Sequence, residues 1–247
     1  MRRLLLPAVL LLLLLSSACA PPKATRAEVT VAAAANLTEV FGKLGPQFES
    51  QTGIHPVFSF GSTAQLTQQI ENRAPFDVFT AADAEHVDKL EGEGLLDPGS
   101  GAVYATGVLV LWSPKSNIDR LEDLASPAVH TIAIAKPQLA PYGEASVETL
   151  TGLGLWNKVE PKVVYAENIN MARQYGLSGN ADAVFTANSL VLREPGRKIQ
   201  VDDSLHRPIV QKLGIVAQSK NQDAARKFAD FLLHGRGHQL LLDSGYR

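Results

Sequence analysis

The chain has 247 residues, which is long enough for one large domain or for two smaller lobes. Its composition is ordinary for a globular α/β protein, with 45% hydrophobic residues, 19% charged residues and a net charge of −2. The sequence has no basic tract that would bind nucleic acid and no acidic tail that would act as a solvating arm. Binding of nucleic acid and a role as an acidic solvating segment are therefore excluded.

The first 19 residues have the pattern of a secretory signal. Arg2 and Arg3 precede an apolar run from Leu4 to Leu15, and small residues follow it. The run is shorter than the roughly 20 residues of a membrane-spanning helix. We therefore expect the mature protein in the periplasm or cell envelope, with residues 20–27 as a flexible stalk.

Cys19 is the only cysteine, which excludes an intramolecular disulfide and a metal site built from cysteines. Its place at the end of the signal resembles a bacterial lipoprotein signal, although Ser16 stands where an aliphatic residue is usual. Ordinary cleavage after Ala20 is the alternative, but it would leave Pro21 at the new N-terminus. The sequence favours lipidation at Cys19.

The mature chain begins with a strand that leads into a helix. Residues 29–31 are apolar, four alanines follow, and Asn36 is then expected to cap the helix. Leu37, Val40, Phe41, Leu44 and Phe48 follow at helical spacing and form one apolar stripe. Such a junction directs free N–H groups toward the carboxyl edge of a sheet, where open α/β sheets bind ligands. An ordinary strand and capped helix without a ligand is the alternative.

Two similar units follow, which predicts a parallel, doubly wound sheet. Residues 53–60 form a strand, and Ser62 and Thr63 begin the next helix. Residues 75–80 form a third strand, which enters a helix near Asp83. Asp77 and Asp83 could form a carboxylate pair for acid–base catalysis. We favour capping roles, because no His, Cys or Ser partner stands at motif spacing.

The second half of the chain predicts another set of α/β units between two long strands. The long strands are residues 104–112 and 208–216, and the chain ends in helices from about 221 to 242. The units between them are strands at 131–135, 162–165 and 182–186, with helices from Pro141 and from Glu167. This order indicates two lobes joined by two crossing strands: residues 28–107 plus 211–247 as lobe 1, and 108–210 as lobe 2.

Four helix starts are candidates for a ligand site between these lobes. They lie at Asn36, Ser62-Thr63, Tyr142 and Asn168-Ile169, two in each lobe. None has Lys or Arg at its cap, and none has the spacing of a phosphate loop or a dinucleotide fingerprint. Helix N-termini that meet in a cleft would suit a small anion, because N–H groups and hydroxyls donate hydrogen bonds and the dipoles add a favourable field.

Four motifs in order along the chain resemble the periplasmic molybdate-binding proteins of ABC importers, the ModA family. They are Val-Thr-Val-Ala-Ala-Ala-Ala-Asn-Leu at 29–37, Phe-Ser-Phe-Gly-Ser-Thr at 58–63, Ala-Pro-Phe-Asp-Val-Phe-Thr-Ala-Ala-Asp at 74–83 and Ser-Gly-Asn-Ala-Asp-Ala-Val-Phe at 178–185. The resemblance implies a type II periplasmic-binding-protein fold, with two α/β lobes and an oxyanion in the cleft. It also implies an ABC permease as partner and no cofactor besides the molybdate or tungstate ligand.

The same resemblance implies the ligand-binding residues. Asn36, Ser62 and Thr63 would donate from side chains, and Tyr142 and Ile169 would donate backbone N–H groups. Thr186 falls where some members place a tyrosine and others a small residue, which leaves the fifth contact open. The implied set is Asn36, Ser62, Thr63, Tyr142, Ile169 and Thr186, with molybdenum present only as oxyanion and no site for a free metal cation.

Two other functions compete with this interpretation. The same fold could bind another small anion, such as sulfate, phosphate or a small carboxylate. A secreted hydrolase is less favoured, because the six histidines are scattered and none stands in a hydrolase or metal-ligand motif. His234 and His238, four residues apart, are more easily explained by the dipole at a helix C-terminus than by a metal. We therefore expect a non-enzymatic, monomeric binding protein.

Overall fold

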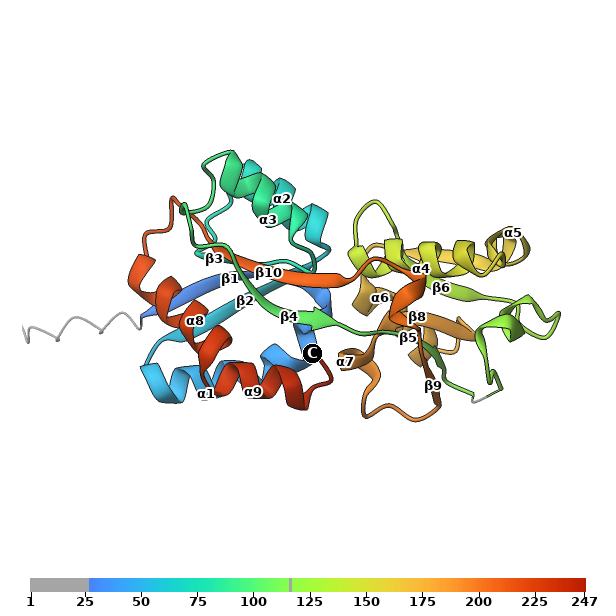
Figure 1. Cartoon of the computed structure of the whole chain (residues 1–247). Helices are drawn as coiled ribbons and strands as arrows, with labels where there is room; N and C mark the ends of the chain where they lie inside the picture. Colours follow the sequence, from blue (N-terminus) through green and yellow to red (C-terminus); the bar gives the residue numbers. More distant parts are fainter. Residues whose placement is uncertain (1–26, 116) are drawn as a thin grey trace, which may run out of the picture.

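The computed structural model describes residues 27–115 and 117–247, which form two α/β lobes side by side (Figure 1). Each lobe contains one five-stranded sheet with helices packed against it. The predicted signal sequence, Cys19 and almost all of the predicted stalk lie outside the described residues. Within the described residues, no helix is both long enough and apolar enough to cross a membrane.

The sheet of lobe 1 has the strand order β2-β1-β3-β10-β4. β1 pairs in parallel with β2 and β3, whereas β10 runs antiparallel to β3 and β4. The sheet is therefore mixed and not wholly parallel as the sequence predicted. The strands are β1 (Glu28–Ala34), β2 (His55–Gly61), β3 (Val78–Thr80), β4 (Ala102–Gly107) and β10 (Ile209–Ile215).

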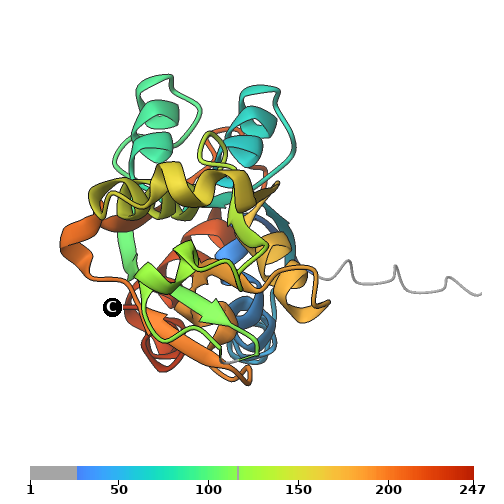
Figure 2. The same cartoon turned by 90° about the vertical axis from the view of Figure 1, so that its right-hand side faces the viewer.

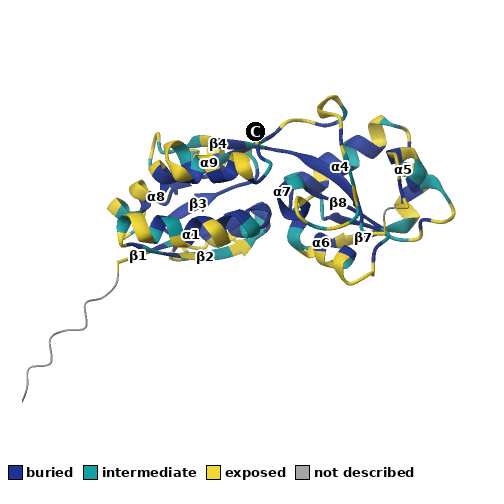
Figure 3. Ribbon diagram, turned by 90° about the horizontal axis from the view of Figure 1, so that it is seen from below, coloured by how far each residue is buried: buried dark blue, intermediate teal, exposed yellow. Residues whose placement is uncertain are grey.

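Both faces of this sheet are covered by helices. Val29, Val31 and Ala33 of β1 pack in one cluster with α1, α8 and α9, and Ala32 packs on the opposite face with α2 and α3. This alternation is the two-residue period of a strand. The helices are α1 (Thr38–Thr52), α2 (Thr63–Glu71), α3 (Glu85–Gly92), α8 (Gln222–His234) and α9 (Arg236–Asp243). The buried and exposed faces of α1, α8 and α9 are visible in Figure 3.

The sheet of lobe 2 has the order β7-β6-β8-β5-β9. β6 is parallel to β7 and β8, and β5 is antiparallel to β8 and β9. Figure 2 looks onto this lobe, with α2 and α3 of lobe 1 beyond it. Its elements are β5 (Leu109–Ser113), β6 (Ile132–Ala135), β7 (Val163–Ala166), β8 (Ala183–Ala187), β9 (Arg197–Gln200), α4 (Pro141–Gly152), α5 (Trp156–Val159), α6 (Ile169–Leu177) and α7 (Asn188–Val191). Short 3-10 helices, η1 (Ala35–Leu37), η2 (Leu121–Ala125), η3 (Glu160–Lys162) and η4 (Asp203–Leu205), complete the described chain.

The long strand predicted over residues 104–112 is in fact two strands. β4 ends at Gly107 in the sheet of lobe 1, and β5 begins at Leu109 in the sheet of lobe 2. Apolar periodicity does not reveal the break, because both strands are buried. The chain returns from lobe 2 to lobe 1 between β9 and β10. The sequence did not predict β9. The predicted lobe boundary between 210 and 211 falls inside β10, which already pairs with β4 at Ile209.

Candidate functional site

A small cavity of about 10 Å³ lies between the two lobes, at the ends of strands from both sheets. Five of the six residues implied by the sequence line it: Asn36, Ser62, Thr63, Tyr142 and Ile169. Its volume is below the roughly 300–1,000 Å³ that is typical of pockets for drug-sized ligands. The other residues in its lining are Ala34, Ala35, Gly61, Ala82, Ala140, Pro141 and Asn168.

Three helices begin at this cavity. α2 begins at Thr63, α4 at Pro141 and α6 at Ile169. The first-turn N–H groups of a helix have no acceptor within it, and the helix dipole makes this end electropositive. None of the residues in the cavity lining carries a charged side chain. The positive potential in the cavity therefore comes from backbone groups of both lobes.

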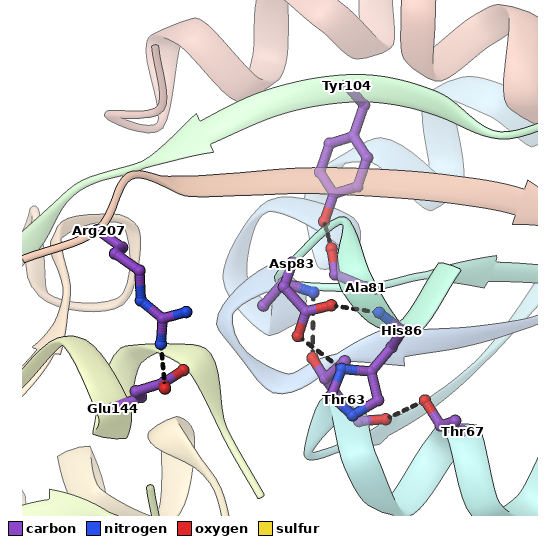
Figure 4. A network of polar contacts seen from close by, with 9 residues as sticks. Thr63, Thr67, Ala81, Asp83, His86, Tyr104, Glu144 and Arg207 are labelled. Atoms are coloured by element: carbon purple, nitrogen blue, oxygen red, sulfur yellow. Dashed lines mark hydrogen bonds and ion pairs between the residues drawn. The ribbon is translucent and has the colours of Figure 1, made fainter. Parts of the chain in front are cut away.

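Thr63 is oriented as a hydrogen-bond donor toward the cavity. Its Oγ1 accepts a hydrogen bond from the backbone N–H of Ala82 at 3.1 Å, and Figure 4 shows this contact beside Asp83. Because the oxygen is engaged as an acceptor, the hydroxyl hydrogen is free to point at a ligand. Ser62 occupies the N-cap position of α2, and its Oγ is buried without a partner among the described residues.

Asn36 does not cap a helix, so that prediction is wrong. It is the middle residue of the 3-10 helix η1, and α1 begins at Thr38 with Leu37 at its N-cap. The Asn36 side chain instead donates from Nδ2 to Gln211 Oε1 and to the Tyr246 hydroxyl, each at 2.9 Å. Its Oδ1 is buried and has no partner in the described part of the chain. Asn36 thus lines the cavity for a tertiary reason and not because it starts a helix.

Tyr142 and Ile169 lie at the first turns of α4 and α6. The Tyr142 hydroxyl does not face a ligand, because it accepts from Gln211 Nε2 of lobe 1 at 2.9 Å. Burial holds the pKa of this phenol, and that of Tyr104, well above the ordinary value, so both stay protonated at neutral pH. Asn168 caps α6 by accepting from the backbone N–H of Met171, and the buried Ile169 is the first residue of the helix.

Thr186 is not brought to the cavity lining. It lies on β8, fully buried, where it pairs with Val110 of β5. Its Oγ1 has no hydrogen-bond partner among the described residues, as is also true of Ser62 Oγ and Asn36 Oδ1. Buried polar groups in folded proteins are nearly always paired, and unpaired ones often mark functional positions. Whether Thr186 contacts a ligand therefore stays a prediction.

The lobes meet around the cavity through direct contacts. The backbone N–H of Ala64 donates to the carbonyl of Leu139 at 3.2 Å, and Gln65 Nε2 donates to Glu167 Oε2 at 3.3 Å. On the α1 side, Arg173 of lobe 2 pairs with Glu39 of lobe 1 at 3.1 Å. The two lobes are therefore in direct contact on more than one side of the small cavity.

A second cavity between the lobes is larger, about 220 Å³, and has charged walls. Asp83 and His86 line it from lobe 1, and Glu144 and Arg207 line it from the other side (Figure 4). Glu148 also belongs to this lining. These groups already pair with one another: Asp83 with His86 at 2.8 Å, and Arg207 with Glu148 at 2.7 Å and with Glu144. The hydrogen bond that His86 donates to the Asp83 carboxylate raises the pKa of His86 above its ordinary value.

The two aspartates considered for catalysis both have structural partners. Asp77 is buried and accepts from the backbone N–H of Thr30 at 2.7 Å and from Ser219 Oγ at 2.6 Å. Asp83 accepts from the backbone N–H of His86 at 2.9 Å, close to the start of α3. His234 and His238 lie on different helices, α8 and α9. Among the described residues, no group of three or more His, Cys, Asp or Glu side chains could hold a metal ion.

The sequence did not identify the residues that hold Asn36 in place. Gln211 comes from β10, Tyr246 from the C-terminal segment and Ser189 from α7, more than 150 positions away along the chain. No local pattern links such distant positions. Only the size and polarity of Gln211, in the middle of a strand that reads as apolar, could have drawn attention to it.

Comparisons with known proteins agree with this geometry. The family model for bacterial extracellular solute-binding proteins matches residues 29–247. The molybdate-binding protein ModA of Azotobacter vinelandii is 39% identical over 229 residues, covering 90% of this chain and 91% of the relative. ModA of Rhodobacter capsulatus is 36% identical over 225 residues, covering 90% and 89%. A solved structure titled as the periplasmic molybdate-binding protein of Azotobacter vinelandii matches with a TM-score of 0.85 and 33% identity, covering 89% of this chain and 98% of that one.

Proposed function

The chain belongs to the ModA family of bacterial extracellular solute-binding proteins, and we propose that it captures molybdate or tungstate outside the inner membrane and delivers it to an ABC permease. The fold is that of type II periplasmic binding proteins. Two relatives with more than 30% identity and a close structural match all carry molybdate in their names.

The observation that carries the proposal is the neutral cavity at three helix N-termini. Its lining offers first-turn N–H groups from α2, α4 and α6, the hydroxyl of Thr63 and the unpaired hydroxyl of Ser62. A tetrahedral dianion accepts hydrogen bonds in several directions and gives none unless it is protonated. A cage of fixed neutral donors therefore suits it without any cationic side chain.

Binding would proceed by closure of one lobe over an anion held by the other. The contacts of Ala64, Gln65 and Glu39 with lobe 2 form only when the cleft is shut. Closure excludes water and strengthens each donor's interaction with the buried charge. Opening at the permease would reverse these contacts and release the anion.

Selectivity against sulfate would follow from the size of the cage. Sulfate has the same charge and shape but is smaller, so the donors of a larger cage cannot all reach it. Each buried donor left unpaired costs about 1–3 kcal/mol. Tungstate has nearly the size of molybdate, and we expect no useful discrimination between these two.

We further propose that the protein acts as a monomer and is tethered to the membrane through a lipid on Cys19. The position of this cysteine after the apolar run supports the tether. Mass spectrometry of the protein purified from membranes tests it: a diacylglyceryl group on Cys19 is expected, and an unmodified N-terminus at any other residue would contradict the anchor.

The decisive experiment is calorimetric titration of the protein lacking residues 1–19 with molybdate, tungstate and sulfate. Tight one-to-one binding of the first two, with no heat from sulfate in excess, is expected. Stronger binding of sulfate or phosphate than of molybdate, or no binding of molybdate, would overturn the ligand assignment.

A further inference from the structure

A network of buried polar side chains lies behind the cavity and joins the two lobes. Asn36, Tyr104, Gln211 and Tyr246 come from lobe 1, and Tyr142 and Ser189 come from lobe 2. All six side chains belong to buried residues. At its centre, Gln211 Oε1 accepts from Asn36 Nδ2 at 2.9 Å and from the Tyr104 hydroxyl at 2.8 Å, and its Nε2 donates to the Tyr142 hydroxyl at 2.9 Å.

In this arrangement Asn36 has no donor left for a ligand. Both hydrogens of its amide go to Gln211 and Tyr246, and the atom without a partner is the acceptor Oδ1. Asn36 nevertheless lines the cavity at the helix N-termini. An amide oxygen that faced an anion would repel it, so an oxyanion in this cavity would favour the reversed amide.

Reversing both amides together keeps the hydrogen bonds of Gln211 to Asn36, Tyr104 and Tyr142 and corrects this mismatch. An amide has almost the same shape in its two orientations, and its neighbours decide which is adopted. After reversal, Gln211 Nε2 donates to Asn36 Oδ1 and to the Tyr104 hydroxyl, and Gln211 Oε1 accepts from Tyr142. Tyr104 can then donate to the carbonyl of Ala81, to which its hydroxyl already lies at 2.8 Å.

The remaining partners also accept the reversal. The Tyr246 hydroxyl lies 2.9 Å from Asn36 Nδ2 and 2.9 Å from the Asn36 carbonyl, so it can turn its hydrogen to the side-chain oxygen. Ser189 Oγ lies 3.2 Å from the same carbonyl and can donate to it. The reversed network leaves no member unpaired and frees Asn36 Nδ2 toward the cavity.

We propose that Gln211 is a positioning residue for anion binding, which turns in concert with Asn36 so that the site presents the Asn36 Nδ2 donor to a bound oxyanion. This inference rests on the proposed function. It adds Gln211 as the residue that determines whether Asn36 presents its donor or its acceptor atom to the cavity. Asn36 is the contact, and Gln211 acts through it.

The network also links donor orientation to closure of the lobes. Tyr142 belongs to lobe 2, and its hydroxyl hydrogen-bonds to the side-chain amide of Gln211 in both orientations of that amide. Gly107, at the crossover between the lobes, makes this approach possible. A Cβ atom there would lie 2.2 Å from the Tyr142 hydroxyl and 2.6 Å from Gln211 Nε2, which is closer than atoms can approach.

The test is a double-mutant cycle with Gln211→Glu and Asn36→Ser, read by molybdate affinity. The carboxylate that Gln211→Glu introduces only accepts when it is ionised, so it would hold Asn36 Nδ2 and leave Oδ1 toward the anion. The hydroxyl that Asn36→Ser introduces rotates freely and is too short to depend on position 211. We expect Gln211→Glu to weaken binding by about 100-fold in the otherwise wild-type protein and by about 10-fold or less in the Asn36→Ser background.

The cycle separates orientation from charge. Repulsion between an ionised carboxylate at position 211 and the anion acts in both backgrounds and cancels. Because burial favours the protonated acid, which can donate to Asn36 Oδ1, the difference should grow as the pH rises from about 6 to about 9. Equal losses of molybdate affinity in both backgrounds across this pH range would overturn the proposed role of Gln211 in orienting Asn36. Melting temperatures of the ligand-free variants identify any that do not fold.

A second measurement uses the wild-type protein alone. The side-chain amide resonances of Asn36 in ¹⁵N spectra, assigned by their absence from Asn36→Ser, should shift strongly when molybdate saturates the site. Unchanged resonances would show that Asn36 Nδ2 keeps its partners. They would overturn the proposed role of Gln211 and leave the proposed function intact. No oxyanion binding by the wild-type protein would overturn both.

Discussion

The two cavities between the lobes use their polar groups in opposite ways. The larger one is lined by the charged side chains of Asp83, His86, Glu144, Glu148 and Arg207, which form ion pairs with one another and leave an excess of carboxylates. The smaller one carries no charged side chain, yet its lining includes hydroxyl and amide atoms without partners and the starts of three helices.

This difference shows that capacity for a ligand depends on unpaired groups and not on formal charge. Arg207 is the only cation in the larger lining apart from a protonated His86, and it is held by two carboxylates. An anion there would compete with these ion pairs. It would also be repelled by the carboxylates of Asp83 and Glu85, which belong to the same lining. In the smaller cavity the Ser62 hydroxyl and the first-turn N–H groups of the three helices would be available to donate to an anion.

The largest effect is expected from a negative charge in the smaller cavity. Asn36→Asp places a carboxylate beside the bound dianion, and two unit charges about 4 Å apart at an effective dielectric constant of about 20 repel by about 4 kcal/mol. We expect molybdate affinity to fall by about a thousandfold or more. Calorimetry with wild-type and Asn36→Asp proteins checks this, and retention of tight binding would exclude this cavity as the site.

Removing the Thr63 hydroxyl should have the next largest effect. Thr63→Val deletes one donor to a charged ligand, worth about 1.5–3 kcal/mol, so affinity should fall about 10- to 150-fold. It also leaves the Ala82 N–H without its acceptor and should lower the melting temperature. Thr63→Ser keeps the hydroxyl and should bind nearly as well as the wild type.

Thr67→Val is the matched control for this variant. Thr67 is one turn along the same helix, is buried, and donates to the Thr63 carbonyl at 2.9 Å without lining the smaller cavity. Its loss should affect stability and leave affinity nearly unchanged. Equal losses of affinity in the two valine variants would mean that the effect is transmitted by the helix and not by the hydroxyl.

The His86–Asp83 pair in the larger cavity should make the stability of the protein depend on pH. Since the pKa of His86 is raised, chiefly by its hydrogen bond to Asp83, the His86–Asp83 pair stabilises the fold fully below the unfolded pKa of about 6.5. This contribution is lost as the pH rises through the higher folded pKa. Glu85 acts in the same direction, and burial and Lys89 oppose it.

Melting curves at about pH 5.5 and about pH 8.5 measure this contribution. The wild type should lose more stability over this interval than His86→Gln, which cannot titrate there. A parallel decline of the two proteins would show that the pair contributes nothing.

The smallest effect on binding is expected from Arg207→Gln. Arg207 is exposed, and exposed ion pairs contribute about 0–1 kcal/mol to stability. Molybdate affinity should stay within about twofold, measured by the same titration. A loss as large as that of Thr63→Val would reverse the comparison and make the charged cavity the anion site.

Local patterns predicted most of the helix starts at the site. Pro141 and Asn168 stand where the first turns of α4 and α6 begin, and Ser62 precedes α2. These positions follow from the backbone preferences of proline and from the side-chain acceptors of serine and asparagine, which act within a few residues. The motif resemblance then grouped them as one site, and five of the six residues do line one cavity.

The same reasoning failed where partners are distant. Asn36 has the residue type of a helix cap, but Gln211 and Tyr246 take its side chain and α1 begins two residues later. The break between β4 and β5 was missed because residues on both sides of it are buried and apolar. Periodicity reports burial and does not report which sheet provides it.

The sequence by itself determined the class of the protein: two sets of α/β units, helix starts with neutral caps, and motifs in the order of a known family. These are local or linear properties, which propensity and spacing encode directly. Only the tertiary structure decided that the helix starts meet in one cavity, that Thr186 lies outside its lining, and that Gln211 is hydrogen-bonded to Asn36. Those facts depend on contacts between residues far apart in the chain, where burial removes water and each polar atom must find its partner in the fold.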